Sequence, residues 1–138
     1  MHRPLLLLFG GWISILALTG CEPEVTGADA ALWVQLPEGV WQVSDLQTDT
    51  GDATSEFSAY RFDFKANQNV YITGPNEFAG LWWVTDSTAG LTTIEFSFSA
   101  ASPMSRLSGE WIENTRTDDM VRFDRLYGNT DVLELTRQ

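Results

Sequence analysis

The chain has very little of the side-chain chemistry that builds cross-links and catalytic sites. Its 138 residues include one cysteine, Cys21, and one histidine, His2. A single cysteine excludes an internal disulfide framework. His2 lies in the N-terminal segment that is expected to be removed as a signal peptide (below), and without a histidine in the mature chain His-dependent catalytic triads and the usual zinc sites are out of reach. We therefore expect no cofactor, no metal and no catalytic residues of these classes.

Basic residues are scarce as well. Eight Lys or Arg stand against nineteen Asp or Glu, and the formal net charge is −11. Nucleic acids and anionic lipid headgroups attract proteins through basic patches. This composition excludes a nucleic-acid partner and argues against electrostatic adhesion to a membrane. Its simplest role is to keep the domain soluble.

The first twenty residues have the organisation of a signal peptide. Met1 to Arg3 is a short basic start, and residues 5 to 18 are almost wholly apolar. A membrane-spanning helix needs about 20 apolar residues, so this shorter run suits the core of a signal peptide. Removal of residues 1–20 takes Arg3 away and leaves seven basic residues against nineteen acidic ones, a formal charge of −12.

The end of this segment, Leu18-Thr19-Gly20-Cys21, resembles the lipobox of bacterial lipoproteins. The resemblance implies cleavage before Cys21 and acylation of that cysteine, so that the lipid bilayer is a partner of the chain. Several acyl chains, at about 0.8 kcal/mol per buried CH₂, make a stable anchor. Glu22 stands where an aspartate would imply retention at the inner membrane, which implies the outer membrane of a Gram-negative cell. The alternative is an ordinary secretory signal.

After the signal peptide (1–20) we expect an acidic, lipidated tether (21–31) and one domain (32–138). The domain alternates apolar and polar residues with a period of two, which predicts strands. The clearest case has Tyr60, Phe62 and Phe64 facing the core. The expected strands are Val40–Ser44, Ser58–Lys65, Val70–Thr73, Leu81–Thr85, Leu91–Ser99, Glu110–Thr115, Met120–Arg125 and Asp131–Arg137.

Two short helical turns interrupt this pattern. One is expected at Leu32–Leu36, and the other at Pro103–Ser108, where Ser102 is a good capping residue before a proline at the first helical position. Eight short strands joined mostly by short turns predict an all-β fold. An eight-stranded antiparallel up-and-down barrel hides its edges best by closing on itself. A two-sheet β-sandwich is the alternative.

The tripeptide Gly-x-Trp occurs three times, ending at Trp41, Trp82 and Trp111. Composition alone predicts about half an occurrence. A glycine permits close approach of the backbone, and the indole two residues later can plug a barrel end. A core plug is the expected role of each of these tryptophans, rather than a platform for a ligand.

The chain has a lipobox, a Gly39-Val40-Trp41 motif that opens the first strand after a helical turn, and Arg137 in the final strand. In these features it resembles lipocalin-like bacterial lipoproteins. Further shared motifs are Tyr-x-Phe-x-Phe in the second strand, Ser102-Pro103 before Trp111, and Thr130-Asp131-x-Leu133 at the end. The resemblance implies a lipocalin-like barrel, with Arg137 lying across the Trp41 ring, and a binding function for an unknown ligand. The chain is shorter than true lipocalins and lacks their disulfide and their helix after the barrel.

The inward-facing positions of the expected barrel are rich in aromatic rings. An eight-stranded barrel is only just wide enough for its own side chains, so we expect a filled interior and weak or no binding of fatty acids. Any pocket is expected to be small, near one open end, beside the Gln47–Glu56 loop. The residues expected to plug the barrel or line a ligand are Trp41, Tyr60, Phe62, Phe64, Trp82, Phe96, Phe98, Trp111, Phe123 and Arg137.

Three functions from different classes remain open. The first is a membrane-anchored binding module for a small apolar molecule, and the second is a structural, interaction or inhibitor lipoprotein that docks to another envelope protein. The third and weakest is a hydrolase with a carboxylate pair, because the carboxylates in the strands are expected to face outward: Asp63, Glu95 and Glu134. A calcium site at Asp49, Asp52 and Glu56 is less favoured than a solvated loop, since the spacing is not that of an EF-hand.

Overall fold

The computed structural model describes residues 31–86, 90–126 and 130–138, and these residues form a mostly β fold. The strands are β1 (Val40–Thr48), β2 (Gly51–Asp52), β3 (Arg61–Phe64), β4 (Asn69–Thr73), β5 (Phe78–Asp86), β6 (Thr92–Ser97), β7 (Gly109–Arg116), β8 (Met120–Arg125) and β9 (Val132–Arg137). The helical segments are α1 (Leu32–Gln35), the 3-10 helix η2 (Leu36–Glu38), α2 (Thr54–Phe57) and the 3-10 helix η3 (Pro103–Leu107).

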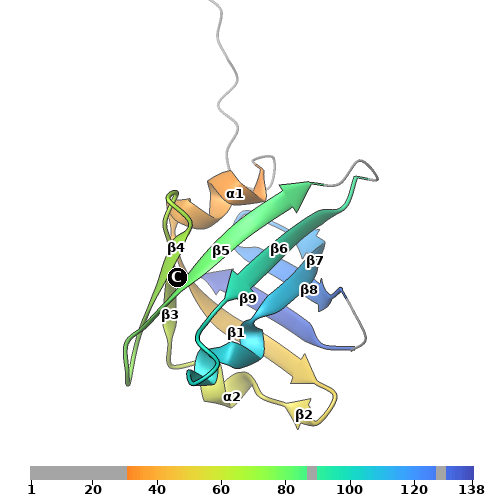
Figure 1. Cartoon of the computed structure of the whole chain (residues 1–138). Coiled ribbons are helices and arrows are strands. Elements are labelled where there is room, and N and C mark those ends of the chain that lie inside the picture. The colour runs from red at the N-terminus through yellow and green to blue at the C-terminus, as the bar shows by residue number, and fades with distance from the viewer. Residues whose placement is uncertain (1–30, 87–89, 127–129) are drawn as a thin grey trace, which may run out of the picture.

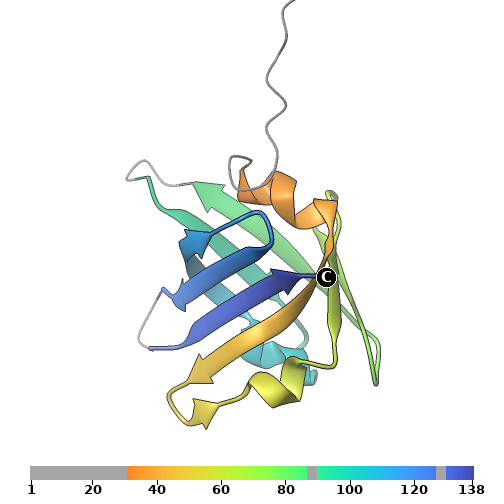
Figure 2. The same ribbon diagram turned by 180° about the vertical axis from the view of Figure 1, so that it is seen from behind.

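The sheet is a closed antiparallel barrel (Figures 1 and 2). Neighbouring strands from β3 to β9 follow chain order, and β1 pairs with both β3 and β9. This last pairing closes eight strands into a ring, so the barrel prediction is confirmed and the sandwich alternative is wrong. The short β2 is an extra strand that pairs only with the end of β1 among the described residues.

The barrel interior is packed with apolar side chains from every long strand. In β3, Phe62 and Phe64 are buried while their neighbours are half-exposed, as the period of two requires. A bulge between Val43 and Asp45 changes the alternation of β1, so that Leu46 is buried as well. The buried core extends from Leu32 in α1 to Leu135 in β9.

Short helices cover both ends of the barrel. Helix α1 lies over one end, and α2 and η3 lie at the other, as both views show. The Gln35 side chain fixes α1 to the β7–β8 turn: its amide donates to the Thr117 carbonyl at 2.7 Å, and its oxygen accepts from Arg116 at 3.0 Å. In η3, Ser102 accepts a hydrogen bond from the Met104 N–H, which confirms the predicted cap.

The segment between Gln47 and Glu56 differs from the loop that the sequence predicts. Strand β1 continues to Thr48, and the chain returns through β2 and α2. Ala53 and Phe57 are buried in the core. This segment therefore covers its end of the barrel with a strand, a helix and two buried side chains.

The nine strands and the buried core of the described residues lie between Leu32 and Arg137. These residues form the closed barrel together with the short helices that cover both of its ends. We therefore expect a fragment of residues 31–138 to fold by itself, and circular dichroism with a cooperative melt checks this. Among the described residues, no helix has the length and hydrophobicity needed to cross a membrane.

Candidate functional site

The three Gly-x-Trp tryptophans are buried, and each indole N–H is satisfied by a carbonyl. Trp41 donates to Leu36 at 2.9 Å, and Trp111 donates to Leu107 at 2.9 Å. In both cases the acceptor belongs to the 3-10 helix that precedes the strand. Trp82 donates to two carbonyls that flank the β3–β4 turn, those of Lys65 at 3.0 Å and Asn69 at 3.1 Å. These tryptophans have the environment of structural residues.

Two of these tryptophan rings are each covered by a different arginine. Arg137 pairs with Trp41 across β9 and β1, and its guanidinium carbon is 5.1 Å from the ring centroid. This contact is the one that the lipocalin resemblance implies. Arg125 pairs with Trp111 across β8 and β7, and its guanidinium carbon is 3.8 Å from the ring centroid. This second contact of the same kind was not predicted from the sequence.

Arg125 is held more firmly than Arg137. It donates to the carbonyls of Ser108 at 2.8 Å and Arg106 at 2.9 Å, and it faces the Asp131 carboxylate at 3.7 Å. Burial lowers the pKa of Arg125, and the attraction of Asp131 opposes this shift. By contrast, Nε and Nη2 of Arg137 are buried without a hydrogen-bond partner.

Gly109 allows Arg125 its position over Trp111. Its φ is +107°, and an added Cβ would lie 3.2 Å from Nη1 of Arg125. Gly51 has a similar φ of +124° but open space around it. We expect Gly51→Ala to cost about 1–3 kcal/mol through backbone strain alone, and Gly109→Ala to cost more because Arg125 must also move. Urea denaturation of both variants measures the difference, and equal costs would contradict it.

The remaining predicted site residues fill the barrel. Phe64 contacts both Trp82 and Phe96, with ring centroids 5.3 Å and 6.0 Å away. The predicted inward aromatics are all buried, as members of one core cluster with the aliphatic side chains of the sheet: Trp41, Tyr60, Phe62, Phe64, Trp82, Phe96, Phe98, Trp111 and Phe123. Of these, Trp82 also borders the pocket described next.

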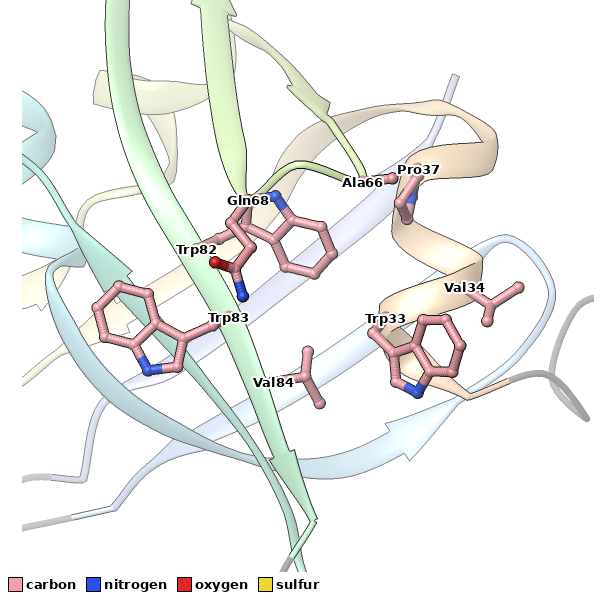
Figure 3. A pocket seen from close by; sticks show the side chains of 8 residues that line it. All are labelled: Trp33, Val34, Pro37, Ala66, Gln68, Trp82, Trp83 and Val84. Atoms are coloured by element: carbon pink, nitrogen blue, oxygen red, sulfur yellow. The ribbon is translucent and has the colours of Figure 1, made fainter.

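A pocket of about 480 Å³ lies at the rim of the barrel, at the α1 end (Figure 3). This pocket does not lie beside residues 47–56, where the sequence led us to expect one, but at the opposite end of the barrel. Its walls come from α1 and η2, the β3–β4 turn and β5. The lining residues are Trp33, Val34, Pro37, Ala66, Gln68, Trp82, Trp83 and Val84.

The pocket follows an unpaired edge of β5. Pairing with β4 ends at Leu81, followed by one further bond from the Trp82 N–H to the Gln68 carbonyl at 3.0 Å. Strand β5 continues to Asp86 with β6 on its other side only. Consecutive residues of an antiparallel strand direct their backbone N–H and C=O groups to opposite edges of the strand. Val84 therefore directs these groups to the same edge as Trp82, away from β6. Polar backbone groups thus face the pocket.

Three polar side chains of the pocket wall lack partners among the described residues: the indoles of Trp33 and Trp83 and the amide of Gln68. Trp33 is 58% exposed. Gln68 has a φ of +71°, the one positive value outside glycine in the described part of the chain. For a residue with a Cβ this conformation costs about 1–2 kcal/mol.

Trp33, Trp83 and Gln68 are not among the predicted site residues, although the sequence contains signals for them. Trp33 follows Leu32 in a helical turn of four residues, where a second large side chain has no core to enter. Trp83 lies on the outward face of β5, whereas its neighbours Trp82 and Val84 lie on the inward face. Gln68 stands at a hairpin position where glycine or asparagine is usual.

Two of the three candidate strand carboxylates form ion pairs at the surface. Asp63 pairs with Lys65 at 2.7 Å, and Glu134 pairs with Arg122 at 3.0 Å. In the predicted calcium loop, Glu56 pairs with Arg106.

Asp52 accepts a hydrogen bond from the Thr54 N–H at the start of α2, and its hydrogen bonds with Thr54 lower its pKa. No three Asp, Glu, His or Cys residues gather as a metal site within the described ranges. The predicted lipidation site, Cys21, lies outside those ranges.

The barrel thus offers a pocket lined by uncharged residues at its rim. Comparisons of the chain with family models, with curated proteins and with solved structures found no match.

Proposed function

We propose that this chain is a lipocalin-like envelope lipoprotein that binds a small, uncharged molecule with an apolar face at the barrel rim. Acylated Cys21 is its anchor in the outer membrane, and residues 32–138 are its binding domain. The lipobox Leu18-Thr19-Gly20-Cys21 supports the anchor. The pocket between α1 and β5 supports the binding role.

The observation that carries the binding proposal is the contrast between a filled interior and an open rim. The core aromatics occupy the space where lipocalin-like barrels hold a ligand. The rim pocket, by contrast, has a volume of about 480 Å³, and small-ligand sites measure about 300–1,000 Å³. The ligand therefore binds beside α1 and not along the barrel axis.

The chemistry of the pocket wall restricts the ligand. All eight lining residues are uncharged, and most are apolar or aromatic. A carboxylate headgroup finds no cation among them, and the net charge of −11 repels it further. Fatty acids are therefore poor ligands for this pocket.

The binding proposal predicts that the fragment of residues 31–138 binds the uncharged fluorescent probe N-phenyl-1-naphthylamine saturably. Trp33→Ala should weaken this affinity about tenfold, because a stacking surface is lost. Tyr71→Ala is the matched control, since Tyr71 is an exposed aromatic residue of β4 outside the pocket. A fluorescence titration measures both affinities. Equal affinities of the two variants, or no saturable binding by the unmodified fragment, would refute the rim site.

Fatty acids provide the second arm of the experiment. Palmitate should neither displace the probe nor alter the tryptophan emission of the fragment at micromolar concentrations. Saturable palmitate binding that is lost in Phe62→Trp or Phe96→Trp would place a ligand inside the barrel. That outcome would replace the rim proposal with a carrier function.

A second candidate function, docking to an envelope protein, is favoured by one observation. Tyr71 of β4 and Leu81 of β5 lie exposed on the outer face of adjacent strands, at 45% and 47%. Exposed apolar pairs of this kind can anchor a protein contact. Cross-linking from position 81 in cells tests this function. A discrete cross-linked protein that is lost in Tyr71→Ala would support it, and its absence would count against it.

A further inference from the structure

We propose that the ligand of the rim pocket is a neutral saccharide unit, held against the Trp33 and Trp83 rings and hydrogen-bonded by their N–H groups and by the Gln68 amide. This inference rests on the proposed binding function and names the class of ligand.

Five tryptophans are described, and their hydrogen bonds separate them into two groups. Trp41, Trp82 and Trp111 are buried, and each donates to a backbone carbonyl between 2.9 and 3.1 Å away. Trp33 and Trp83 are more exposed, and neither has a partner for its N–H within the described ranges. The fold therefore accounts for three indoles and leaves two donors available at the pocket.

These two indoles flank the pocket from different elements. Figure 3 shows Trp33 on α1 and Trp83 on β5, with Val84 between them. Each offers an apolar ring face and a polar edge. A pyranose ring has the complementary shape, because its C–H groups form an apolar face and its hydroxyls project around the rim. The ring can pack on an indole while its hydroxyls accept from the N–H groups.

Gln68 adds a polar group at some cost to the fold. Its positive φ is a conformation that Gly or Asn adopts with less strain. Its amide borders the pocket and makes no hydrogen bond within the described residues. An amide both donates and accepts, which matches a hydroxyl that does the same. The backbone of Gln68 donates to the Lys65 carbonyl and accepts from the Trp82 N–H, both at 3.0 Å, but glycine could make these two bonds without the strain. A strained residue whose side chain makes no hydrogen bond within the described residues indicates a role in binding.

The other ligand classes fit this wall less well. A purely apolar ligand leaves two indole N–H groups, the Gln68 amide and the Val84 backbone edge unsatisfied. An anion meets no cation among the lining residues, and a cation meets no carboxylate there. A neutral, polyhydroxylated ring satisfies both the aromatic faces and the free polar groups. A partly open site also suits a ligand that stays hydrated on one side.

The test measures binding of defined sugars to the fragment of residues 31–138 by isothermal titration calorimetry and saturation-transfer NMR. The probes are glucose, N-acetylglucosamine, cellobiose and chitobiose. Sorbitol is the matched control ligand, because it carries hydroxyls without the ring face. We expect saturable binding of at least one disaccharide with a millimolar or lower Kd, and none of sorbitol.

Variants separate ring stacking from hydrogen bonding. Trp33→Ala and Trp83→Ala should each weaken saccharide affinity about tenfold, whereas Trp83→Phe should cause a smaller loss, because it keeps a ring and removes the N–H. Gln68→Gly should raise the melting temperature by relieving the strained φ, yet weaken saccharide binding. A structural role for Gln68 does not predict this opposite effect on stability and affinity. Tyr71→Ala, which lies outside the pocket, should leave saccharide affinity unchanged.

Each contrary outcome has a definite meaning. Binding of N-phenyl-1-naphthylamine at the Trp33 site without binding of any sugar overturns the saccharide inference and leaves the binding function standing. Binding of neither overturns both. Saturable binding of tetramethylammonium in place of sugars overturns the inference in favour of a cation cage. Unchanged sugar affinity in Gln68→Gly overturns the assignment of that residue.

Discussion

Truncation of Trp111 to alanine is expected to lower the free energy of unfolding by about 3–5 kcal/mol, and truncation of Trp41 by a similar amount. Both indoles are fully buried, and each closes one end of the barrel. Each also donates to the 3-10 helix before its strand, η2 for Trp41 and η3 for Trp111. Alanine removes the ring and leaves a buried carbonyl without its donor.

The arginines over these rings provide graded controls. Arg137→Ala should cost clearly less than Trp41→Ala, because a cation over a ring contributes about 0.5–2 kcal/mol and two of the Arg137 nitrogens have no partner to lose. Arg125→Ala should cost more than Arg137→Ala. It removes donors from the carbonyls of Arg106 and Ser108 and leaves Asp131 without its cation.

Urea denaturation of the fragment, followed by far-ultraviolet circular dichroism, gives all four free energies on one scale. Trp33→Ala is the matched control for loss of an indole, since Trp33 is exposed and should change stability little. If Trp41→Ala and Trp111→Ala melt like Trp33→Ala, the two rings do not close the barrel, and the role assigned to the Gly-x-Trp motif is wrong.

The fold was predictable because the period of two is strong in this chain. Alternation at Tyr60, Phe62 and Phe64 follows directly from the pleat of a strand, and strand count with short turns favours closure. Barrel and sandwich were not separable, because closure depends on pairing between β1 and β9, residues about 90 positions apart. Local patterns carry no information about such a contact.

The Gln47–Glu56 segment shows a second limit. Its Thr, Asp and Gly residues are typical of loops, yet tertiary packing of Ala53 and Phe57 folds it into β2 and α2. Burial of one aromatic ring outweighs weak local propensities.

The candidate site was the least predictable part of the molecule. Its walls come from α1, the β3–β4 turn and β5, which meet only in the folded barrel. The aromatic residues that repeat with a period of two stand out in the sequence, and that period is typical of core positions. The polar groups available to a ligand are those outside this pattern, namely Trp33, Gln68 and Trp83.

The second large effect concerns the anchor. Cys21→Ser is expected to abolish incorporation of labelled palmitate into the full chain and to release the protein from the membrane fraction or leave it uncleaved. The hydroxyl of serine cannot replace the sulfur that accepts the diacylglyceryl group, and Cys21 is the single cysteine of the chain. Gly20→Ala is the matched control, because it keeps a small residue before the cysteine and should still be labelled.

Metabolic labelling in a Gram-negative host, followed by fractionation and mass spectrometry of the mature N-terminus, measures this effect. Helix α1 begins eleven residues after Cys21, and a chain of that length spans at most about 40 Å. An anchor at Cys21 therefore restricts the rim pocket to this distance from the bilayer, since Trp33 and Val34 belong to α1. Cys21→Ser should remove this restriction without changing the ligand affinity of the purified barrel. Persistent labelling and membrane association of Cys21→Ser would show that the chain is held by other means.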